Sequence, residues 1–272
     1  MLLAALPAHS QSFLSRSELG ISVGGMNYLG DLNNQSMFGQ VNLAGGVAAR
    51  IHLDTRWCLA LGATYGHISG GNPDVIAHRN LSFRSYIQEA FLRAEFNFLP
   101  YGLRPGTQRR YTPYIFCGIA LFRFNPMAEY QGEWYALQPL GTEGQGTSAY
   151  PDRQKYRLLD FSVPFGIGFR YRLSPDVHLS VEYGWRRTTT DYLDDVSTTY
   201  VGYDLLAGDE GNGEMAALLA DRTGEIDPGY VNAIGIKRGD DSLDDWYAYF
   251  NVSLTVSAEV LFGWMRGKTC ER

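Results

Sequence analysis

The chain has 272 residues, a formal net charge of −6, 31 glycines and 14% aromatic residues. It is too rich in apolar and aromatic residues for a disordered chain, and it has no apolar run of the 18 or so residues that a membrane-spanning helix needs. Its acidic balance and singly scattered arginines argue against nucleic-acid binding. The three cysteines (Cys58, Cys117 and Cys270) have neither a metal-site spacing nor an even count, so we expect two packing residues and a tail thiol.

The first residues resemble the end of an export signal. Residues 1–7 are apolar, and the small residues Ala8 and Ser10 stand before Gln11 as they do at a signal-peptidase site. We therefore predict export, with residues 1–10 as the remnant of a signal and residues 11–272 as one barrel domain.

Alternation of apolar and polar residues with period two predicts eight β-strands. They cover residues 17–28, 41–53, 57–69, 84–98, 111–125, 160–173, 177–188 and 245–262. Each exceeds the 9 to 11 residues that a tilted strand needs to cross the hydrocarbon layer, whereas strands average about five or six residues elsewhere. The excess length favours strands that span a membrane.

The predicted connections alternate in length. Residues 54–56, 99–110 and 174–176 make the shorter ones, whereas the longest cover about 126–159 and 189–244. Short turns on one side and long loops on the other are typical of bacterial outer-membrane barrels. The sequence thus predicts an all-β, eight-stranded antiparallel transmembrane β-barrel with extracellular long loops and both termini in the periplasm. The alternative, a soluble lipocalin-like barrel, would need a charged exterior and shorter strands.

In such a barrel the apolar strand face meets lipid and the charged face lines the lumen. The predicted interior charges are Glu18, Arg50, Glu89, Arg93, Glu95, Arg170, Arg172, Glu182, Arg186 and Glu259. Equal numbers of both signs in a lumen just wide enough for side chains predict a neutralising network and not an open channel. Near strand ends, Trp57, Trp185, Trp246 and Trp264 are expected in interfacial girdles.

Two patterns are candidates for chemistry. His178 and Ser180 share a strand face, as a base and a nucleophile can, but they follow a short turn and face the lumen, so we predict no enzymatic activity and no cofactor. Asp191, Asp194 and Asp195 form an oxygen-rich cluster that is a weak candidate for Ca²⁺, the alternative being a solvated acidic loop. In the longest loop, residues 214–221 are expected to form a short helix.

Five segments together resemble PorG, the small outer-membrane barrel family of the type IX secretion system of Bacteroidota. They are residues 24–32 (GGMNYLGDL), 113–126 (PYIF through LFRFNP), 137–146 (LQPLGTEGQG), 164–168 (PFGIG) and 191–200 (DYLDDVSTTY). The resemblance runs from about residue 18 to 201 and includes the last strand. Residues 202–244 carry nothing that matches.

The resemblance implies a non-enzymatic barrel that associates with a periplasmic ring of PorK and PorN and holds it at the outer membrane. It also implies a part in protein secretion and, in some species, in gliding motility. A ring could reach only the short turns and the termini, and arginine is favoured at interfaces. We therefore expect contacts at Arg56, Arg104, Arg109 and Arg110.

Two alternatives stay open. One is a generic outer-membrane barrel acting as an adhesin or envelope stabiliser, and the other is a lipid-modifying enzyme or narrow transporter. The motif at residues 137–146 either folds over the barrel mouth or contacts another outer-membrane subunit.

Overall fold

A computed structural model describes residues 13–33, 40–71, 79–102 and 109–262 of the chain. The predicted signal remnant, Arg104, Trp264 and Cys270 lie outside the described residues. Eight long strands form the wall: β1 (Ser17–Leu29), β2 (Asn42–His52), β3 (Trp57–Gly70), β4 (Phe83–Asn97), β5 (Tyr111–Tyr130), β7 (Leu159–Arg172), β8 (Val177–Thr188) and β9 (Trp246–Ser257). All eight predicted strands are confirmed.

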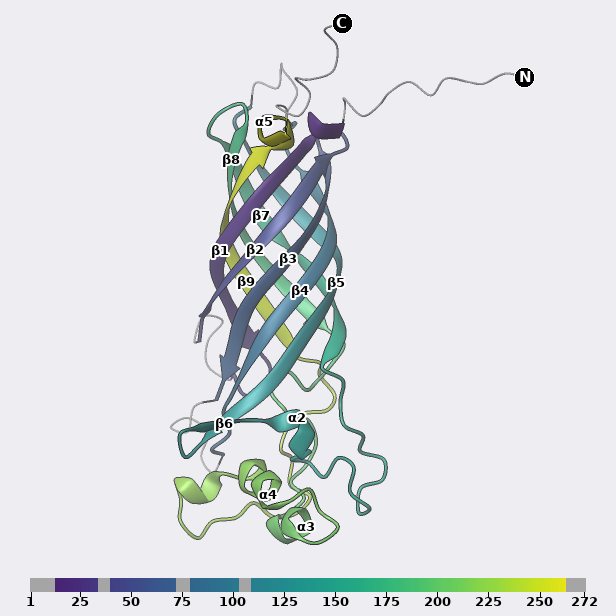
Figure 1. The fold of residues 1–272 in the computed structure, drawn as a ribbon, viewed down its shortest axis with the longest axis vertical. Helices are drawn as coiled ribbons and strands as arrows, with labels where there is room; N and C mark the ends of the chain where they lie inside the picture. Colours follow the sequence, from purple (N-terminus) through teal and green to yellow (C-terminus); the bar gives the residue numbers. More distant parts are fainter. Residues whose placement is uncertain (1–12, 34–39, 72–78, 103–108, 263–272) are drawn as a thin grey trace, which may run out of the picture.

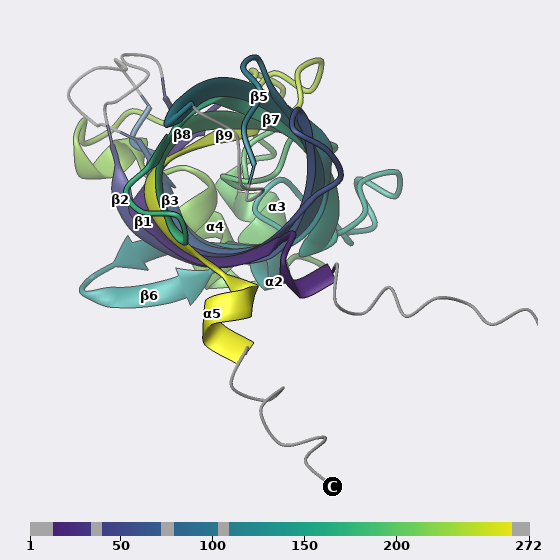
Figure 2. The same cartoon turned by 90° about the horizontal axis from the view of Figure 1, so that it is seen from above.

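The wall closes on itself. Each of the eight strands pairs antiparallel with its neighbour along the chain, and β9 pairs back onto β1, for example at Ser22 and Ser253. Figure 2 shows the resulting ring from one end. The short β6 (Glu133–Ala136) pairs only with the far end of β5 and projects beyond the ring. Because a closed barrel has no unpaired sheet edge, its backbone groups are satisfied without water.

The wall has apolar residues on its outer face and polar residues on its inner face, the reverse of the distribution in a soluble protein. Along β7, Phe161 and Ile167 are exposed, whereas Ser162 and Arg170 on the opposite face are buried. The other strands repeat this alternation, with exposed Leu61 on β3 and Ile119 on β5. An apolar outer wall of this extent is stable where lipid covers it. The chain is therefore a transmembrane β-barrel of the outer-membrane type, and the lipocalin-like alternative does not hold.

Aromatic rings lie on the outer wall near both ends of the strands. Trp57 at the start of β3 packs against Phe96, with ring centroids 4.9 Å apart. Toward the other end, Phe165 lies 5.8 Å from Trp185 and 5.9 Å from Trp246. Trp57, Trp185 and Trp246, the described members of the predicted girdles, thus occupy positions where an interfacial girdle needs them.

The two shortest connections lie at one end of the barrel and the two longest at the other, as predicted. Residues 53–56, 98–110 and 173–176 connect strands at the first end, the short-turn end, and the two longest connections lie at the other, the long-loop end (Figure 1). The long-loop end carries α2 (Leu137–Leu140), α3 (Tyr203–Ala207), α4 (Glu214–Ala220) and the 3₁₀ turn η1 (Thr223–Glu225). Helix α4 confirms the short helix predicted at residues 214–221. Among the described residues, no helix combines the length and apolar character needed to cross a membrane.

The last strand is shorter than predicted. It ends at Ser257, and α5 (Ala258–Phe262) follows it at the short-turn end. Glu259 is therefore exposed on α5, and its predicted place in the lumen was wrong. The alternation of residue types continues beyond Ser257, but in a helix it no longer sorts side chains to the two sides of a wall.

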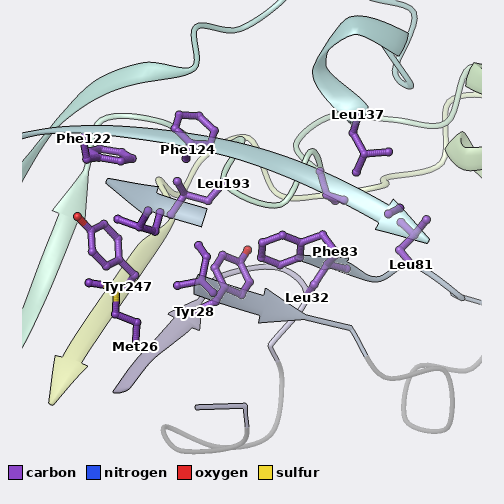
Figure 3. Close-up of a cluster of buried hydrophobic side chains, with 14 of the residues drawn as sticks. Met26, Tyr28, Leu32, Leu81, Phe83, Phe122, Phe124, Leu137, Leu193 and Tyr247 are labelled. Atoms are coloured by element: carbon purple, nitrogen blue, oxygen red, sulfur yellow. The ribbon is translucent and has the colours of Figure 1, made fainter. Parts of the chain in front are cut away.

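The main apolar core lies at the long-loop mouth of the barrel (Figure 3). Strand residues Met26, Tyr28, Phe83, Phe122, Phe124 and Tyr247 meet loop residues Leu32, Leu81, Leu137, Leu193, Val196 and Leu219 there. Hydrophobic burial thus packs the long loops onto the wall, and we call the packed residues 137–158 and 189–245 the lid.

Candidate functional site

A layer of buried charges crosses the middle of the lumen. Glu182 accepts hydrogen bonds from Arg93 at 2.6 and 3.0 Å and from Arg50 at 3.1 Å. Glu95 accepts hydrogen bonds from Arg50 at 3.1 Å, Arg93 at 3.0 Å and Arg170 at 2.6 Å. Three guanidinium groups from three strands therefore share two carboxylates. Loss of any one member would destabilise the barrel, because its partners would be left buried and unpaired.

A second layer lies nearer the long-loop end. Glu89 pairs with Arg186 at 3.2 Å and accepts hydrogen bonds from the hydroxyls of Tyr247 at 2.7 Å and Thr64 at 3.2 Å. A hollow of about 20 Å³, with walls that include Thr64 and Asn251, lies within the lumen. This volume suits about one water molecule. Side chains thus fill this part of the lumen.

A third layer closes the lumen near the short-turn end. Glu18 accepts a hydrogen bond from Thr255 at 3.0 Å and lies 2.6 Å from Nε2 of His52, whose Nδ1 lies 3.2 Å from the Cys58 sulfur. Tyr101, from the connection between β4 and β5, is fully buried, and its hydroxyl forms a hydrogen bond with Nδ1 of His178. The Tyr101 backbone nitrogen donates to the Thr55 carbonyl at 2.7 Å. Tyr101 therefore holds its connection against the barrel end.

The structure places most of the predicted interior charges in these layers. Arg172 is only half-buried, at the short-turn end, where it donates a hydrogen bond to the Gly102 carbonyl. Glu259 is outside, as described above. The remaining eight are buried in the lumen: Glu18, Arg50, Glu89, Arg93, Glu95, Arg170, Glu182 and Arg186.

His178 and Ser180 do face the lumen near the short-turn end, but they do not form a base–nucleophile pair. Both side chains are buried, and Nδ1 of His178 is occupied by Tyr101. Within the described residues the Ser180 hydroxyl has no hydrogen-bond partner. The arrangement therefore gives no support for nucleophilic chemistry at this pair.

At the long-loop end, Glu143 connects three segments of the lid. Its Oε1 accepts hydrogen bonds from the Ser197 backbone nitrogen at 2.9 Å and from Arg238 at 3.0 Å. Its Oε2 accepts from the Thr198 backbone nitrogen at 3.0 Å and hydroxyl at 2.6 Å. Two of the segments are the motifs at residues 137–146 and 191–200. Of the two roles considered for the first motif, folding over the barrel mouth is the one observed.

Glycines allow this motif its tight turn. Gly141 has φ +60°, and a Cβ built there would lie 2.7 Å from the Gln145 carbonyl oxygen. Gly144 has φ +80°, and its Cβ would lie 2.9 Å from the Tyr150 ring. A side chain at either position would be strained by its backbone angles and would also meet its neighbours.

Asp195 makes a second connection within the lid. Its carboxylate accepts hydrogen bonds from Thr142 at 2.5 Å and Tyr156 at 2.7 Å, and it lies 3.7 Å from the Arg238 guanidinium. Burial raises the pKa of Asp195 to about 6, although Arg238 opposes the shift. This carboxyl group is thus already partnered by two hydroxyls and a cation.

One junction between lid and wall is a tyrosine that lies between two carboxyl groups. The Tyr28 hydroxyl lies 2.7 Å from Asp194 and 2.6 Å from Asp245, and all three side chains are buried. A phenol carries one proton and can donate it to only one of the two, so the second short contact requires a proton on a carboxyl group. Burial raises the pKa of Asp194 to about 7, and burial together with the nearby Asp194 raises the pKa of Asp245. We call this group the Asp–Tyr–Asp junction.

The three aspartates considered for calcium are not brought together. Asp194 contacts Tyr28, whereas Asp195, at φ +68°, turns its carboxylate toward Thr142 and Tyr156. Burial raises the pKa of Asp191 to about 8, which disfavours the charged form that a cation would need. Across the described residues, no group of three or more His, Cys, Asp or Glu side chains is arranged to hold a metal ion.

Three of the four predicted ring-contact residues are described, and they lie on the short-turn surface. Arg56, Arg109 and Arg110 are exposed there, and Arg104 falls outside the described residues. Arg56 donates to the Phe98 carbonyl at 2.7 Å, and its own carbonyl accepts from the Asn97 backbone nitrogen at 2.7 Å. The turn at residues 53–56 and the connection at 98–110 are thus neighbours.

Sequence reasoning did not identify Glu143, Arg238 or Tyr28 as functional candidates. Glu143 lies within a motif that was singled out, but nothing in its spacing shows that it is buried. Arg238 is one of three basic residues among ten acidic ones in residues 202–244, which is a weak signal for a buried pair.

Comparisons with known proteins give a family and a set of similar folds. A family model described as "Domain of unknown function (DUF6089)" matches residues 1–209. No curated protein matches the chain. Neisserial surface protein A has 10% identity and a TM-score of 0.42, with 89% of this chain and 96% of that chain covered. OprG from Pseudomonas aeruginosa has 11% identity and a TM-score of 0.41, covering 88% and 95%. Ail from Yersinia pestis has 7% identity and a TM-score of 0.40, covering 89% and 98%.

Proposed function

The chain belongs to the DUF6089 family, and we propose that it is a non-enzymatic outer-membrane component of the type IX secretion apparatus that anchors the periplasmic ring of PorK and PorN. In this proposal the short-turn end and both termini face the periplasm, and the long loops face outward. The apolar wall is embedded among outer-membrane lipids.

The filled lumen is the observation that supports a structural role for the barrel. Charged layers, the Tyr101 closure and the lid occupy the barrel from end to end, so its interior offers no wide path for a solute. This supports a function carried by the outer surfaces, and it weakens the alternative of a narrow transporter. The resemblance of the five sequence segments to PorG is the reason for assigning the chain to the type IX secretion apparatus.

The short-turn surface is the proposed contact site for the periplasmic ring. Arg56, Arg109 and Arg110 present exposed guanidinium groups on two neighbouring connections. Arginine forms bidentate pairs with carboxylates and is enriched at protein interfaces. Tyr101 is buried at the barrel end, and the Arg110 carbonyl accepts a hydrogen bond from the Arg172 backbone nitrogen at 2.6 Å, so both described parts of this connection are held on the barrel.

The test compares two double variants of a tagged chain, each expressed in its own outer membrane. Arg109→Glu with Arg110→Glu reverses two charges at the short-turn end. Arg157→Glu with Arg187→Glu makes the same change in charge at exposed positions of the long-loop half. After gentle detergent extraction, co-purified ring proteins are quantified by mass spectrometry.

We expect the first variant to lose most of the ring proteins and the second to retain them. Equal recovery with both variants would move the contact away from these arginines. Absence of ring proteins from the unaltered chain, under conditions that leave the ring intact, would refute the anchoring role. A generic adhesin would then be the better account, because the lid exposes apolar side chains such as Val231 and Ile234.

A further inference from the structure

The outer part of the lid contains a pocket that the anchoring role does not use. Val201, Ala217 and Ala220 are buried around it, and the more exposed Tyr203 and Val231 also line it. Its volume is about 180 Å³. An apolar cavity of about 150 Å³ is enough to accept benzene, so this pocket can accept one aromatic ring or branched aliphatic side chain. We call it the lid pocket.

Apolar side chains continue from the pocket onto the surface. Val231 is 68% exposed and Ile234 67% exposed, and Ile226 and Ile236 are exposed as well. Ile234 packs against Gly202, where an added Cβ would lie 2.9 Å from it, so Ile234 adjoins the pocket lining. Helices α3 and α4 of this region lie at the end of the molecule farthest from the short turns (Figure 1), beyond the strands that lipid would cover. Exposed apolar groups gathered in this way are typical of an interaction site.

The segment that forms most of the lid pocket is strongly acidic. Residues 202–244 contain ten acidic and three basic residues. All three basic side chains are already paired, Arg222 with Glu225, Lys237 with Asp240 and Arg238 with Glu143. Asp221 lines the pocket itself, and Asp204 is exposed on α3 beside the lining residue Tyr203. A partner segment that carries positive charge would therefore be attracted to this acidic region and oriented on it.

We propose that the lid pocket is a docking site for a polypeptide segment that inserts one aromatic or branched aliphatic side chain and carries lysine or arginine on both sides of it. The apolar anchor fills the pocket, as the central residue of an interface hot spot does. The flanking cations meet the acidic rim. This site is at the opposite end of the barrel from the proposed ring contact, so each can fail without the other.

The test uses a defined probe, the capped peptide Lys-Lys-Trp-Lys-Lys carrying a fluorinated tryptophan. The full chain is reconstituted in nanodiscs of zwitterionic phosphatidylcholine, and the ¹⁹F signal of the peptide is followed as the protein is added. A peptide with serine in place of tryptophan tests the anchor, and one with glutamate in place of lysine tests the rim. Nanodiscs without protein measure attraction to lipid.

Two variants alter the pocket lining in different ways. Gly224 lines the pocket, has no positive φ, and an added Cβ there would meet no atom within 4 Å, so Gly224→Leu adds a bulky side chain to the lining without strain. Val231→Asn replaces an apolar lining residue with a polar one and leaves the net charge unchanged. The matched control is Leu243→Asn, since Leu243 is also 68% exposed but does not line the pocket.

We expect Gly224→Leu and Val231→Asn to weaken probe binding at least tenfold, and Leu243→Asn to change it less than twofold. The serine and glutamate peptides are expected to bind at least tenfold more weakly than the probe. Equal binding to all variants, or equal binding to empty nanodiscs, would overturn the proposal in favour of general charge attraction or a lipid partner. So would a failure of the probe to bind the unaltered chain at millimolar concentration.

Discussion

The lumen and the lid both bury many charged groups, but they neutralise them in different ways. In the lumen each carboxylate of the middle layer meets at least two guanidinium groups, for example Glu182 with Arg50 and Arg93. In the lid, Arg238 is bound to Glu143 and lies near Asp195, whereas Asp194 and Asp245 face each other across the Tyr28 hydroxyl. The lumen is therefore held by fixed charges and the Asp–Tyr–Asp junction by a proton. This difference predicts a wall that is insensitive to mild changes in pH and a lid that responds to them.

The largest expected effect is the loss of a central carboxylate in the lumen. Glu95→Ala leaves Arg50 and Arg93 with Glu182 alone and removes the carboxylate that pairs with Arg170, and an uncompensated buried charge costs about 3–5 kcal/mol. The free energy of unfolding, measured in lipid vesicles by urea titration, should fall by about that amount. The control Glu129→Ala removes an exposed carboxylate and should change it by less than about 0.5 kcal/mol. Similar values for the two variants would mean that the layer does not hold the wall.

A smaller and more local effect is expected at Glu143. Glu143→Ala removes five hydrogen-bond contacts and leaves Arg238 buried with less compensation, so the lid should loosen by about 3 kcal/mol while the barrel stays folded. Hydrogen exchange should accelerate in residues 191–200 and near 238 but not in the strands. Glu214→Gln, at an exposed glutamate of α4, should leave both patterns unchanged. Exchange that accelerates in the strands as well would show that wall and lid are one cooperative unit.

The pH dependence of the lid should follow the Asp–Tyr–Asp junction. The pKa of Asp194 is about 7 in the closed lid and near 3.8 when exposed, so the closed lid holds more protons between these values. Lid stability is therefore full below about pH 4 and decreases as the pH rises to about 7. For each proton released, the opening constant should rise by up to about tenfold per pH unit.

Limited proteolysis of the lid across pH 4 to 8 measures this opening. Asp194→Asn, an uncharged mimic of the protonated group, should make the profile shallower, with Asp191 and Asp195 responsible for the slope that remains, whereas Asp209→Asn at an exposed position should not change it. A lid that becomes more resistant as the pH rises would contradict the assignment of a shared proton.

The smallest effect is expected at the short-turn closure. Tyr101→Phe keeps the ring in place but loses the hydrogen bond to His178, which should lower the free energy of unfolding by about 1 kcal/mol. Tyr101→Ala should cost more, because it also empties a buried site. The same urea titration measures the free energy of unfolding of both variants. Equal decreases for the two would mean that the Tyr101 aromatic ring does not pack in the lumen.

Sequence patterns predicted the wall far better than the lid, for a physical reason. In a closed barrel, lipid and lumen impose a two-residue period on every strand, so the eight strands and the lumen positions of residues such as Arg93 and Glu182 can be read from alternation. Glu259 shows the limit of the method, because the alternation continued past the point where the strand ended. The lid has no such repeating pattern of apolar and polar residues. Its main contacts join residues 95 positions apart, as in Glu143 and Arg238, or 166 apart, as in Tyr28 and Asp194.

The most direct test of the anchoring role is photo-crosslinking in living cells. A benzoylphenylalanine residue replaces Arg109 at the short-turn end or Arg157 at the long-loop end, and the crosslinked products are identified by mass spectrometry. The account predicts adducts with PorK or PorN from position 109 and none from position 157. Adducts with the ring proteins from position 157 alone, or none from position 109 while the ring is intact, would contradict it.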